Sequence, residues 1–589
     1  MSLKTFHRVS LCVVLILSVF VSPEPASAFE TFNFTVDSTD DTPDADPDDN
    51  ECADASEHCT LRAALEQSKP LTQSDHTVNI YFNFPSPATI VLHSDLPQNT
   101  EANLINNEPL GHITINGNHW RGLTISGDQD TTIQGLIFED FGSDGILVYI
   151  GGNDVIANNV FVGNHAGIYV SGLETNQGDV HITGNFIGYH PINELPDPNT
   201  RGIHVKDLES TDGTCNIWIG GLNAEDRNFI AGNGQSGIYI DNDKSTTYVN
   251  ILNNYIGMID DTTPVYNYKY GIEVIKSRGP LVIGGDYLTQ GNLIAGNRNI
   301  GIYVEESSNA SIRGNTFSSN KAGTAYIPNQ FGDIAVSDSP YLRIGGDSPN
   351  FGNVIPQGLR VEKDEVNNQN LLIKHNFIGI SRTGYVFPTD LPSYGINVEF
   401  ATGFPEISYN QITNFRKGIV LSGTTMVPIM KNKIYNNSEM GIDLNNDGVT
   451  LNDNLDLDTG PNGLQNFPII SNVDVDDYGA VKIINFDVTL HSAANKQYLI
   501  EVFSNPFCGS NGYGQGKQVF AFNNGITTNG DGNSNIWHIS ELYPTNIIGP
   551  CLSATATEFD GVHYLGTSEF SEGVMAWELE KLYLPMIVK

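Results

Sequence analysis

Gly237-Ile238-Tyr239-Ile240 is one copy of a four-residue motif, Gly-Ile-x-Val or a near variant, that recurs through the middle of the chain. Because side chains alternate along a strand, the motif predicts a short strand whose second and fourth residues face one way and whose third faces the other. Copies begin at Gly145, Gly167, Gly202, Gly237, Gly271, Gly301, Gly395, Gly418 and Gly441.

The spacing of these copies predicts the fold. Where nothing is inserted it is 22 or 23 residues (145 to 167, 395 to 418, 418 to 441), and elsewhere it lengthens. A fixed period with variable loops is typical of a solenoid, in which each coil buries its apolar side against its neighbours. Two or three short strands fit in one coil, so the sequence predicts an all-β protein built on a parallel β-helix.

Charge and composition restrict the partners. The 589 residues include 59 Gly and have a formal net charge of -39, with only 29 Lys and Arg. Such a surface repels nucleic acid and other polyanions. We therefore expect no nucleic-acid partner.

The first 28 residues have the form of a secretory signal peptide. Lys4 and Arg8 precede an apolar run from Leu11 to Val21, and Ala26-Ser27-Ala28 follows as an A-x-A cleavage site. The run is too short for a comfortable membrane span. We expect cleavage near Ala28 and a protein that is secreted or held at the cell surface, with no membrane span.

Cysteine positions agree with export. Cys52 and Cys59 are close enough to close a local loop, and Cys508 and Cys551 share the C-terminal region. In an oxidising compartment we expect these as two disulfides, which leaves Cys215 free and buried.

A helix is expected just before the solenoid. Thr60 is a suitable N-cap for a segment with Leu61, Ala64 and Leu65 on one face. Such a helix would cover the open first coil, whose edge would otherwise recruit other strands.

The same segment carries a family resemblance. Cys59-Thr60-Leu61-Arg62-Ala63-Ala64-Leu65 resembles the Cys-Ser-Leu-Arg-Glu-Ala-Ile motif of secreted bacterial right-handed parallel β-helix repeat proteins, with Ala63 in place of Glu. Ile113-Thr114-Ile115-Asn116-Gly117 and Leu123-Thr124-Ile125-Ser126-Gly127 resemble the first coils of that family. The resemblance implies a right-handed helix and export, and it implies hardly anything about activity.

The pattern changes after the last repeat. From Val473, runs rich in β-branched and aromatic residues alternate with Gly/Asn turns, which predicts a β-sandwich of about 100 residues. Leu582 to Lys589 is an apolar end, either an edge strand or a surface-sorting tail. The expected domains are 1–28 signal peptide, 29–112 N-terminal cap and first coils, 113–470 parallel β-helix, 471–577 β-sandwich and 578–589 apolar tail.

Long inserts precede some of the repeated strands, at 189–201, 258–270 and 380–394. They must leave the solenoid at one corner, on alternate coils, about 9–10 Å apart. We expect their tyrosines to form a wall beside the Gly-Ile sheet. Asn and Gly recur at the corners, where stacked asparagines can hydrogen-bond from coil to coil.

The outward residues of the Gly-Ile strands are the candidate binding site. Aromatic, imidazole and charged groups at one strand spacing suit a sugar polymer, because rings stack on sugar CH faces and polar neighbours bind hydroxyls. The other interpretation is an ordinary outer β face, in which Tyr is a good strand former. The candidate carbohydrate-binding residues are Tyr169, His204, Lys206, Tyr239, Glu273 and Tyr303.

A catalytic pair is the alternative use of this face. Asp241 and Glu305 share a strand position two coils apart, near the upper end of the separation that an inverting glycosidase needs. Glu362 and Glu399 offer a closer pair. A solenoid this acidic produces such pairs by chance.

A calcium loop is suggested at the end of the repeat. Asp443, Asn445 and Asp447 stand at alternate positions before Gly448, with Asn454 where a bidentate Glu would be expected. Asp453, Asp456 and Asp458 could supply oxygens instead. The alternative is an Asx-rich turn without metal. No cofactor is required.

The sequence therefore favours a secreted or surface β-helix protein that binds an extracellular polysaccharide or serves as a stalk without catalysis. The alternative is a polysaccharide lyase or glycoside hydrolase, similar to pectate lyases or polygalacturonases, acting on the Gly-Ile face. The sequence sets no oligomeric state.

Overall fold

The structure is a computed structural model. It describes residues 30–576 except 75, 86, 99, 109–111, 150, 173–177, 209–214, 244–246, 363–367, 389–391, 424–425, 479–480 and 545–548. The expected signal peptide and the apolar tail at 578–589 lie outside the described residues.

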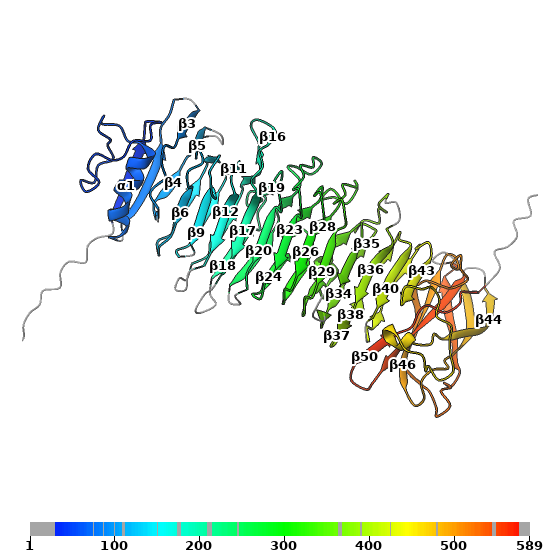
Figure 1. Cartoon of the computed structure of the whole chain (residues 1–589). Coiled ribbons are helices and arrows are strands. Elements are labelled where there is room, and N and C mark those ends of the chain that lie inside the picture. The colour runs from blue at the N-terminus through cyan, green and yellow to red at the C-terminus, as the bar shows by residue number, and fades with distance from the viewer. Residues whose placement is uncertain are drawn as a thin grey trace, which may run out of the picture.

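Three long parallel sheets run the length of the molecule, and most coils give one strand to each (Figure 1). Sheet A contains β1 (Thr31–Val36), β2 (Thr77–Phe82), β4 (Asn103–Ile105), β7 (Thr132–Gln134), β10 (Asp154–Ala157), β13 (Val180–Thr183), β18 (Asn216–Gly220), β21 (Tyr248–Leu252), β24 (Leu281–Gly284), β27 (Ala310–Arg313), β30 (Arg343–Gly345), β34 (Leu372–Lys374), β38 (Glu406–Ser408) and β41 (Ile429–Met430).

Sheet B contains β3 (Ala88–Val91), β5 (Ile113–Asn116), β8 (Ile137–Glu139), β11 (Val160–Val162), β14 (Phe186–Ile187), β19 (Phe229–Ile230), β22 (Tyr255–Ile256), β25 (Leu293–Ile294), β28 (Thr316–Phe317), β31 (Val354–Ile355), β35 (Phe377–Ile378), β39 (Gln411–Thr413) and β42 (Lys433–Tyr435).

Sheet C is built from the Gly-Ile strands. It contains β6 (Leu123–Ile125), β9 (Ile146–Tyr149), β12 (Ala166–Ser171), β17 (Arg201–Lys206), β20 (Ile238–Asp241), β23 (Ile272–Ile275), β26 (Ile302–Glu305), β29 (Ile334–Ser337), β32 (Leu359–Glu362), β36 (Tyr394–Glu399), β40 (Lys417–Ser422) and β43 (Met440–Leu444). The fold is the predicted right-handed parallel β-helix.

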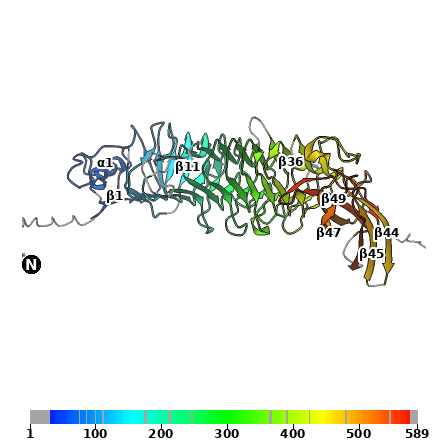
Figure 2. The same cartoon turned by 90° about the horizontal axis from the view of Figure 1, so that it is seen from below.

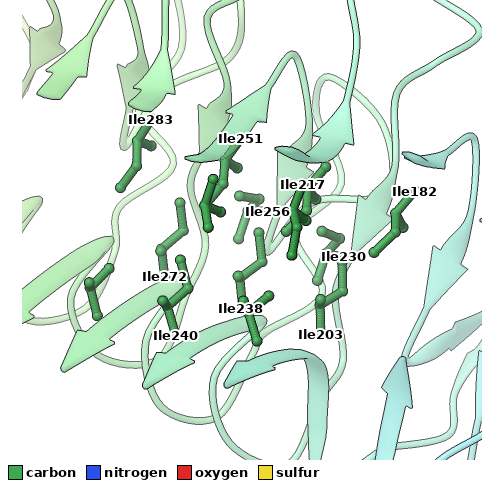
Figure 3. Packing of buried hydrophobic residues seen from close by; sticks show 14 of the residues in the cluster. Ile182, Ile203, Ile217, Ile230, Ile238, Ile240, Ile251, Ile256, Ile272 and Ile283 are labelled. Atoms are coloured by element: carbon green, nitrogen blue, oxygen red, sulfur yellow. The ribbon is translucent and has the colours of Figure 1, made fainter. Parts of the chain in front are cut away.

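The interior explains why the motif is repeated. The Ile of each motif points inward and meets the aliphatic side chains of the two other sheets, as Figure 3 shows for Ile203, Ile238 and Ile272. These side chains are fully buried, and each contributes about 1.5–3 kcal/mol. One apolar stack thus runs through the whole solenoid.

Two rows of buried asparagines line the corners, as the sequence predicts. Each side chain donates to a backbone carbonyl and to the next Asn; Asn254, for example, bonds Ile219 O at 2.8 Å and Asn292 Oδ1 at 3.1 Å. The row between sheets A and B comprises Asn159, Asn185, Asn228, Asn254, Asn292, Asn315, Asn353, Asn376, Asn410 and Asn432. A second row, between sheets B and C, runs from Asn164 to Asn329.

Inserts leave the helix between sheets B and C on alternate coils. The structure has four where the sequence suggested three, because the segment between β28 and β29 also projects, closed by an antiparallel bridge from Ser319 to Tyr326. The first insert carries the short hairpin of β15 (Tyr189–His190) and β16 (Leu195–Pro196). A small ladder beside sheet A pairs β33 (Asn368–Gln369) with β37 (Ala401–Thr402).

The expectation that the inserts form a wall beside the Gly-Ile sheet is wrong for most of their length. They fold over the outer face of sheet B, where Met258 packs with Tyr255 and Leu293. This face carries apolar side chains that need cover. The end of the second insert that returns to the helix does reach sheet C, where Lys269 pairs with Glu273 and Tyr270 stacks on Tyr303.

Both ends of the helix are closed (Figures 1 and 2). Helix α1 (Leu61–Thr72) is N-capped by Thr60, whose hydroxyl accepts from the Ala63 N–H at 3.0 Å, and its apolar face packs on the first coil. Arg62 is buried and paired with Asp41 at 2.8 Å. The predicted capping helix is therefore confirmed.

A two-sheet sandwich closes the other end. One sheet comprises β44 (Ile469–Asp477), β45 (Val481–Thr489) and β48 (Trp537–Pro544), and the other comprises β46 (Gln497–Asn505), β47 (Gln518–Thr527), β49 (Cys551–Phe559), β50 (Tyr564–Thr567) and β51 (Val574–Met575). Two 3-10 helices, η1 (Pro349–Phe351) and η2 (Pro461–Leu464), lie in connections. Phe503 and Phe570 continue the apolar core of the helix into the sandwich.

Both predicted disulfides, Cys52–Cys59 and Cys508–Cys551, are formed, and Cys215 is buried and belongs to neither, as predicted. In the part of the chain that the structure describes, every helix is too short or too polar to cross a membrane.

Candidate functional site

The register of sheet C brings the predicted residues into one line. Each pairs directly with the next along the sheet, one strand apart. We call this line the outer file: Tyr169, His204, Tyr239, Glu273 and Tyr303. A second line, two residues further along each strand, comprises Ser171, Lys206, Asp241, Ile275 and Glu305.

Two members of the outer file are buried, contrary to the expectation that all five face a ligand. His204 is 9% exposed and lies between two tyrosine rings, 4.6 Å from Tyr169 and 4.9 Å from Tyr239. Burial, with Arg201 and Lys206 nearby, lowers the pKa of His204 to about 3. The imidazole is neutral at physiological pH and acts as a spacer between the two rings.

Glu273 is buried by an insert end. It is 3% exposed, its carboxylate meets the Lys269 ammonium at 2.5 Å, and it also accepts from the Ser236 hydroxyl. Lys269 belongs to the returning end of the second insert. The insert thus occupies the position where Glu273 was expected to meet a sugar.

The three tyrosines are half-buried. Arg201 covers the ring of Tyr239 at 4.3 Å, and Tyr270 stacks on Tyr303 at 4.8 Å. Burial, together with the charge on Glu305, raises the pKa of the Tyr303 hydroxyl. Burial also raises the pKa of Tyr169 and Tyr239, so all three hydroxyls stay protonated; the Tyr303 hydroxyl donates to the Glu305 carboxylate.

Beyond Tyr303 the outer file meets a small residue and the surface becomes hollow. Ala335 pairs with Tyr303 on one side and Arg360 on the other. Phe331, Gln357, Arg360 and Tyr394 surround a space of about 150 Å³, which we call the Ala335 hollow. Phe331 is 65% exposed at its edge.

The sequence pattern does not predict a site at this hollow. The only signal was a looser copy of the motif at Asp333-Ile334, where Ala stands at the outward position that the five preceding copies fill with Tyr, His or Glu. A small side chain such as Ala leaves a cavity only if the side chains on the two neighbouring strands do not fill the space. The sequence alone does not show which side chains those are.

The candidate catalytic residues lie as the register predicts, on one line with Ile275 between them. Two strand spacings place Asp241 and Glu305 about 9–10 Å apart, at the upper limit for an inverting pair. Lys206, the sixth of the candidate carbohydrate-binding residues, lies on the same line, and its Nζ is 3.8 Å from the carboxylate of Asp207. Catalysis at this face stays a prediction.

The candidate calcium ligands are occupied by protein partners. Asp443 is buried and meets Lys417 Nζ at 2.7 Å, and Asn445 donates to Asp447 Oδ2 at 2.9 Å. Asp453, Asp456 and Asp458 form a separate group whose oxygens lie within 4.8 Å of one another. Burial raises the pKa of Asp456 to about 6. Calcium binding at either group stays a prediction.

Comparison with known proteins agrees with the fold. Residues 121–288 match the family model described as the right-handed beta helix region. The matched coils and the three parallel sheets define a right-handed parallel β-helix protein.

Two phage proteins are similar among solved structures. Full-length tailspike protein 2 from Escherichia coli O157:H7 bacteriophage CAB120 is 12% identical, with a TM-score of 0.24, over 86% of this chain and 66% of that chain, just under two thirds. The gp42 tailspike of Acinetobacter phage vb_AbaP_AS12 is 7% identical, with a TM-score of 0.27, over 95% of this chain and 84% of that chain. Neither likeness carries weight for function.

Proposed function

We propose that this protein is an extracellular or cell-surface rod that binds a polysaccharide along the outer face of sheet C, without catalysis. The observation that carries the proposal is the spacing of Tyr169, Tyr239 and Tyr303. They occupy every second strand of one file, so half-exposed tyrosine side chains recur about 9–10 Å apart.

The face suits an extended ligand for two further reasons. The Ala335 hollow continues the line of tyrosines and is bordered by Arg360, Gln357 and Tyr394. The Gln357 amide donates to Ser318 Oγ and Asn329 O, so Gln357 offers a ligand only its carbonyl oxygen. The buried asparagine rows hold the coils in register, so the rings are positioned before a ligand arrives and little ordering is needed on binding. The two disulfides are consistent with an oxidising compartment.

A glycan array followed by calorimetry on the retained polysaccharide tests the proposal. Tyr239→Ala and Tyr303→Ala should each weaken binding about tenfold, which corresponds to about 1.4 kcal/mol. Tyr248→Ala is the matched control, because Tyr248 is 46% exposed on sheet A. Retention of no polysaccharide would leave only a structural stalk.

The enzymatic alternative is tested with the same ligand panel. If the wild-type protein produces new reducing ends or unsaturated uronates and Asp241→Asn or Glu305→Gln does not, the face catalyses cleavage of the polysaccharide and the proposal of binding without catalysis is wrong. Binding without products in the wild-type protein supports the proposal as stated.

A further inference from the structure

A second and larger recess lies where the last coils meet the sandwich. We call it the junction recess; its volume is about 410 Å³, within the range typical of small-molecule sites, which are common at domain interfaces. From the helix side Lys374, Tyr409 and Lys431 line it, and from the sandwich side Leu499, Phe522 and Tyr564 do. In Figure 1 the strands that carry these walls, β34 and β38 on one side and β46 and β50 on the other, converge at this end.

The recess is held open by contacts that cross the junction. The Lys431 N–H donates to both carboxylate oxygens of Glu501, at 3.1 and 3.2 Å, and Glu501 is 2% exposed. The backbone N–H of Ile429 donates to the Thr567 hydroxyl at 2.8 Å, and Ile434 forms an antiparallel bridge with Gly516. These bonds fix one wall relative to the other, so the recess is formed before a ligand binds.

Aromatic rings form its apolar walls. The Phe522 side chain is 68% exposed on the sandwich side. Tyr409 faces it from the helix side of the recess and is backed by His375, whose ring is stacked at 4.8 Å and nearly parallel. Large exposed aromatic surface bordering a recess is typical of a binding site.

The two lysines of the recess differ in their partners. Lys374 is paired with Glu406 at 3.1 Å and lies 3.9 Å from Asp347, and Glu406 also accepts from the Ser408 hydroxyl at 2.6 Å, so the charge on Lys374 is offset. Lys431 Nζ instead donates to the Tyr409 hydroxyl at 2.9 Å, and that hydrogen bond raises the pKa of Lys431. Among the described residues no carboxylate is ion-paired with the Lys431 ammonium. Lys431 is therefore the lysine of the recess whose ammonium is left for a ligand, although the charge on the buried Glu501 carboxylate also acts on it; burial raises the pKa of Glu501 to about 7, which weakens that offset.

We propose that the junction recess binds a single carboxylate-bearing sugar unit, with the carboxylate on Lys431 and a CH face of the ring against Phe522. The recess has room for one such ring and offers a charge of the opposite sign beside an aromatic surface. Ser408 and Asn524 add polar groups at its border for sugar hydroxyls. This site is separate from sheet C and does not depend on the function proposed above.

Calorimetry or saturation-transfer NMR on the full chain tests the inference with glucuronic acid, N-acetylneuraminic acid and glucose. At least one acidic sugar should bind at least tenfold more tightly than glucose, and added salt should weaken it, because the Lys431 contact is partly exposed. Lys431→Gln should remove the preference for the acidic sugar. Phe522→Ala should weaken binding severalfold, and Phe522→Trp should retain it.

Matched controls separate this site from the rest of the surface. Lys276→Gln and Leu542→Ala change an exposed cation and an exposed apolar side chain elsewhere and should leave binding unchanged. Tyr303→Ala should also have no effect on the acidic sugar. Equal affinity for glucose and the acidic sugars, no binding of either, or full binding by Lys431→Gln would overturn the inference.

Discussion

Two rows of side chains run along the same coils and differ in almost every property. The asparagine row between sheets A and B repeats one residue ten times, is buried throughout, and satisfies its amides within the row. The outer file repeats only a position: its side chains are Tyr, His, Tyr, Glu and Tyr, and their exposure alternates. A uniform row is what coil-to-coil stability requires, whereas a varied row at the surface is free to recognise a ligand. The predictions below test this division.

The largest effect is expected in the uniform row. Asn254→Ala removes the donor to Ile219 O and the acceptor of Asn228, and so leaves buried backbone groups without partners. Each such group costs about 1–3 kcal/mol, so the free energy of unfolding should fall by about 3–5 kcal/mol. Denaturant unfolding followed by circular dichroism measures this.

Asn250→Ala provides the control, because Asn250 lies on an outward position of the same strand, β21. It should change stability by less than about 0.5 kcal/mol. If both variants lost the same free energy of unfolding, the buried asparagine row would contribute no more to the stability of the helix than an outward-facing asparagine does.

A gain in stability of similar size is expected when a buried carboxyl group is removed from the interior of the helix. Asp154 is 1% exposed at a position paired with Val180, and its carboxyl has the backbone of Thr131 as a hydrogen-bonding neighbour but no cation beside it among the described residues. Burial raises the pKa of Asp154 to about 8. In the unfolded chain this carboxyl loses its proton near pH 4, whereas in the folded chain it keeps the proton up to about pH 8. The free energy of unfolding therefore falls progressively as the pH rises from about 4 to 8.

Asp154→Val should therefore stabilise the protein and remove this dependence. The gain should be about 2–4 kcal/mol at pH 7 and small at pH 4. Thermal unfolding at several pH values measures it. A gain that is independent of pH would show that the carboxyl is hydrated in solution.

A smaller loss is expected where the outer file contains a buried charge. Lys269→Met leaves Glu273 without its cation, and stability should fall by about 1–3 kcal/mol because Lys269 itself is partly exposed. Lys276→Met removes the exposed partner of Glu306 and should cost less than about 0.5 kcal/mol. Urea midpoints compare the two. Similar shifts would mean that Glu273 is not desolvated.

The smallest effect is expected at His204. His204→Phe keeps a ring between Tyr169 and Tyr239 and removes a buried nitrogen without a partner. Stability should change by less than about 1 kcal/mol, and glycan affinity should stay within about twofold. A large loss of affinity would place the imidazole in contact with the ligand and contradict its role as a spacer.

The fold was predictable because it is a local pattern repeated many times. Ile238 and its equivalents specify the strand and its inward face, and Asn254 and its equivalents specify the corner. The order of the outer file followed from this period alone. Its accessibility did not, because Lys269 and Tyr270 reach Glu273 and Tyr303 from an insert whose path is set by contacts with sheet B.

By itself, the sequence determined the repeat, the direction in which each side chain leaves its strand, the helical cap and the Cys52–Cys59 disulfide, since each depends on residues close together or on a regular period. Cys508 and Cys551 are 43 residues apart, and they could be paired because they are the two cysteines of the C-terminal region. Only the tertiary structure decided which side chains stay accessible. The cover on sheet B, the Ala335 hollow and the junction recess all form between segments distant in sequence, where the volume and charge of neighbouring side chains, rather than any period, determine the surface.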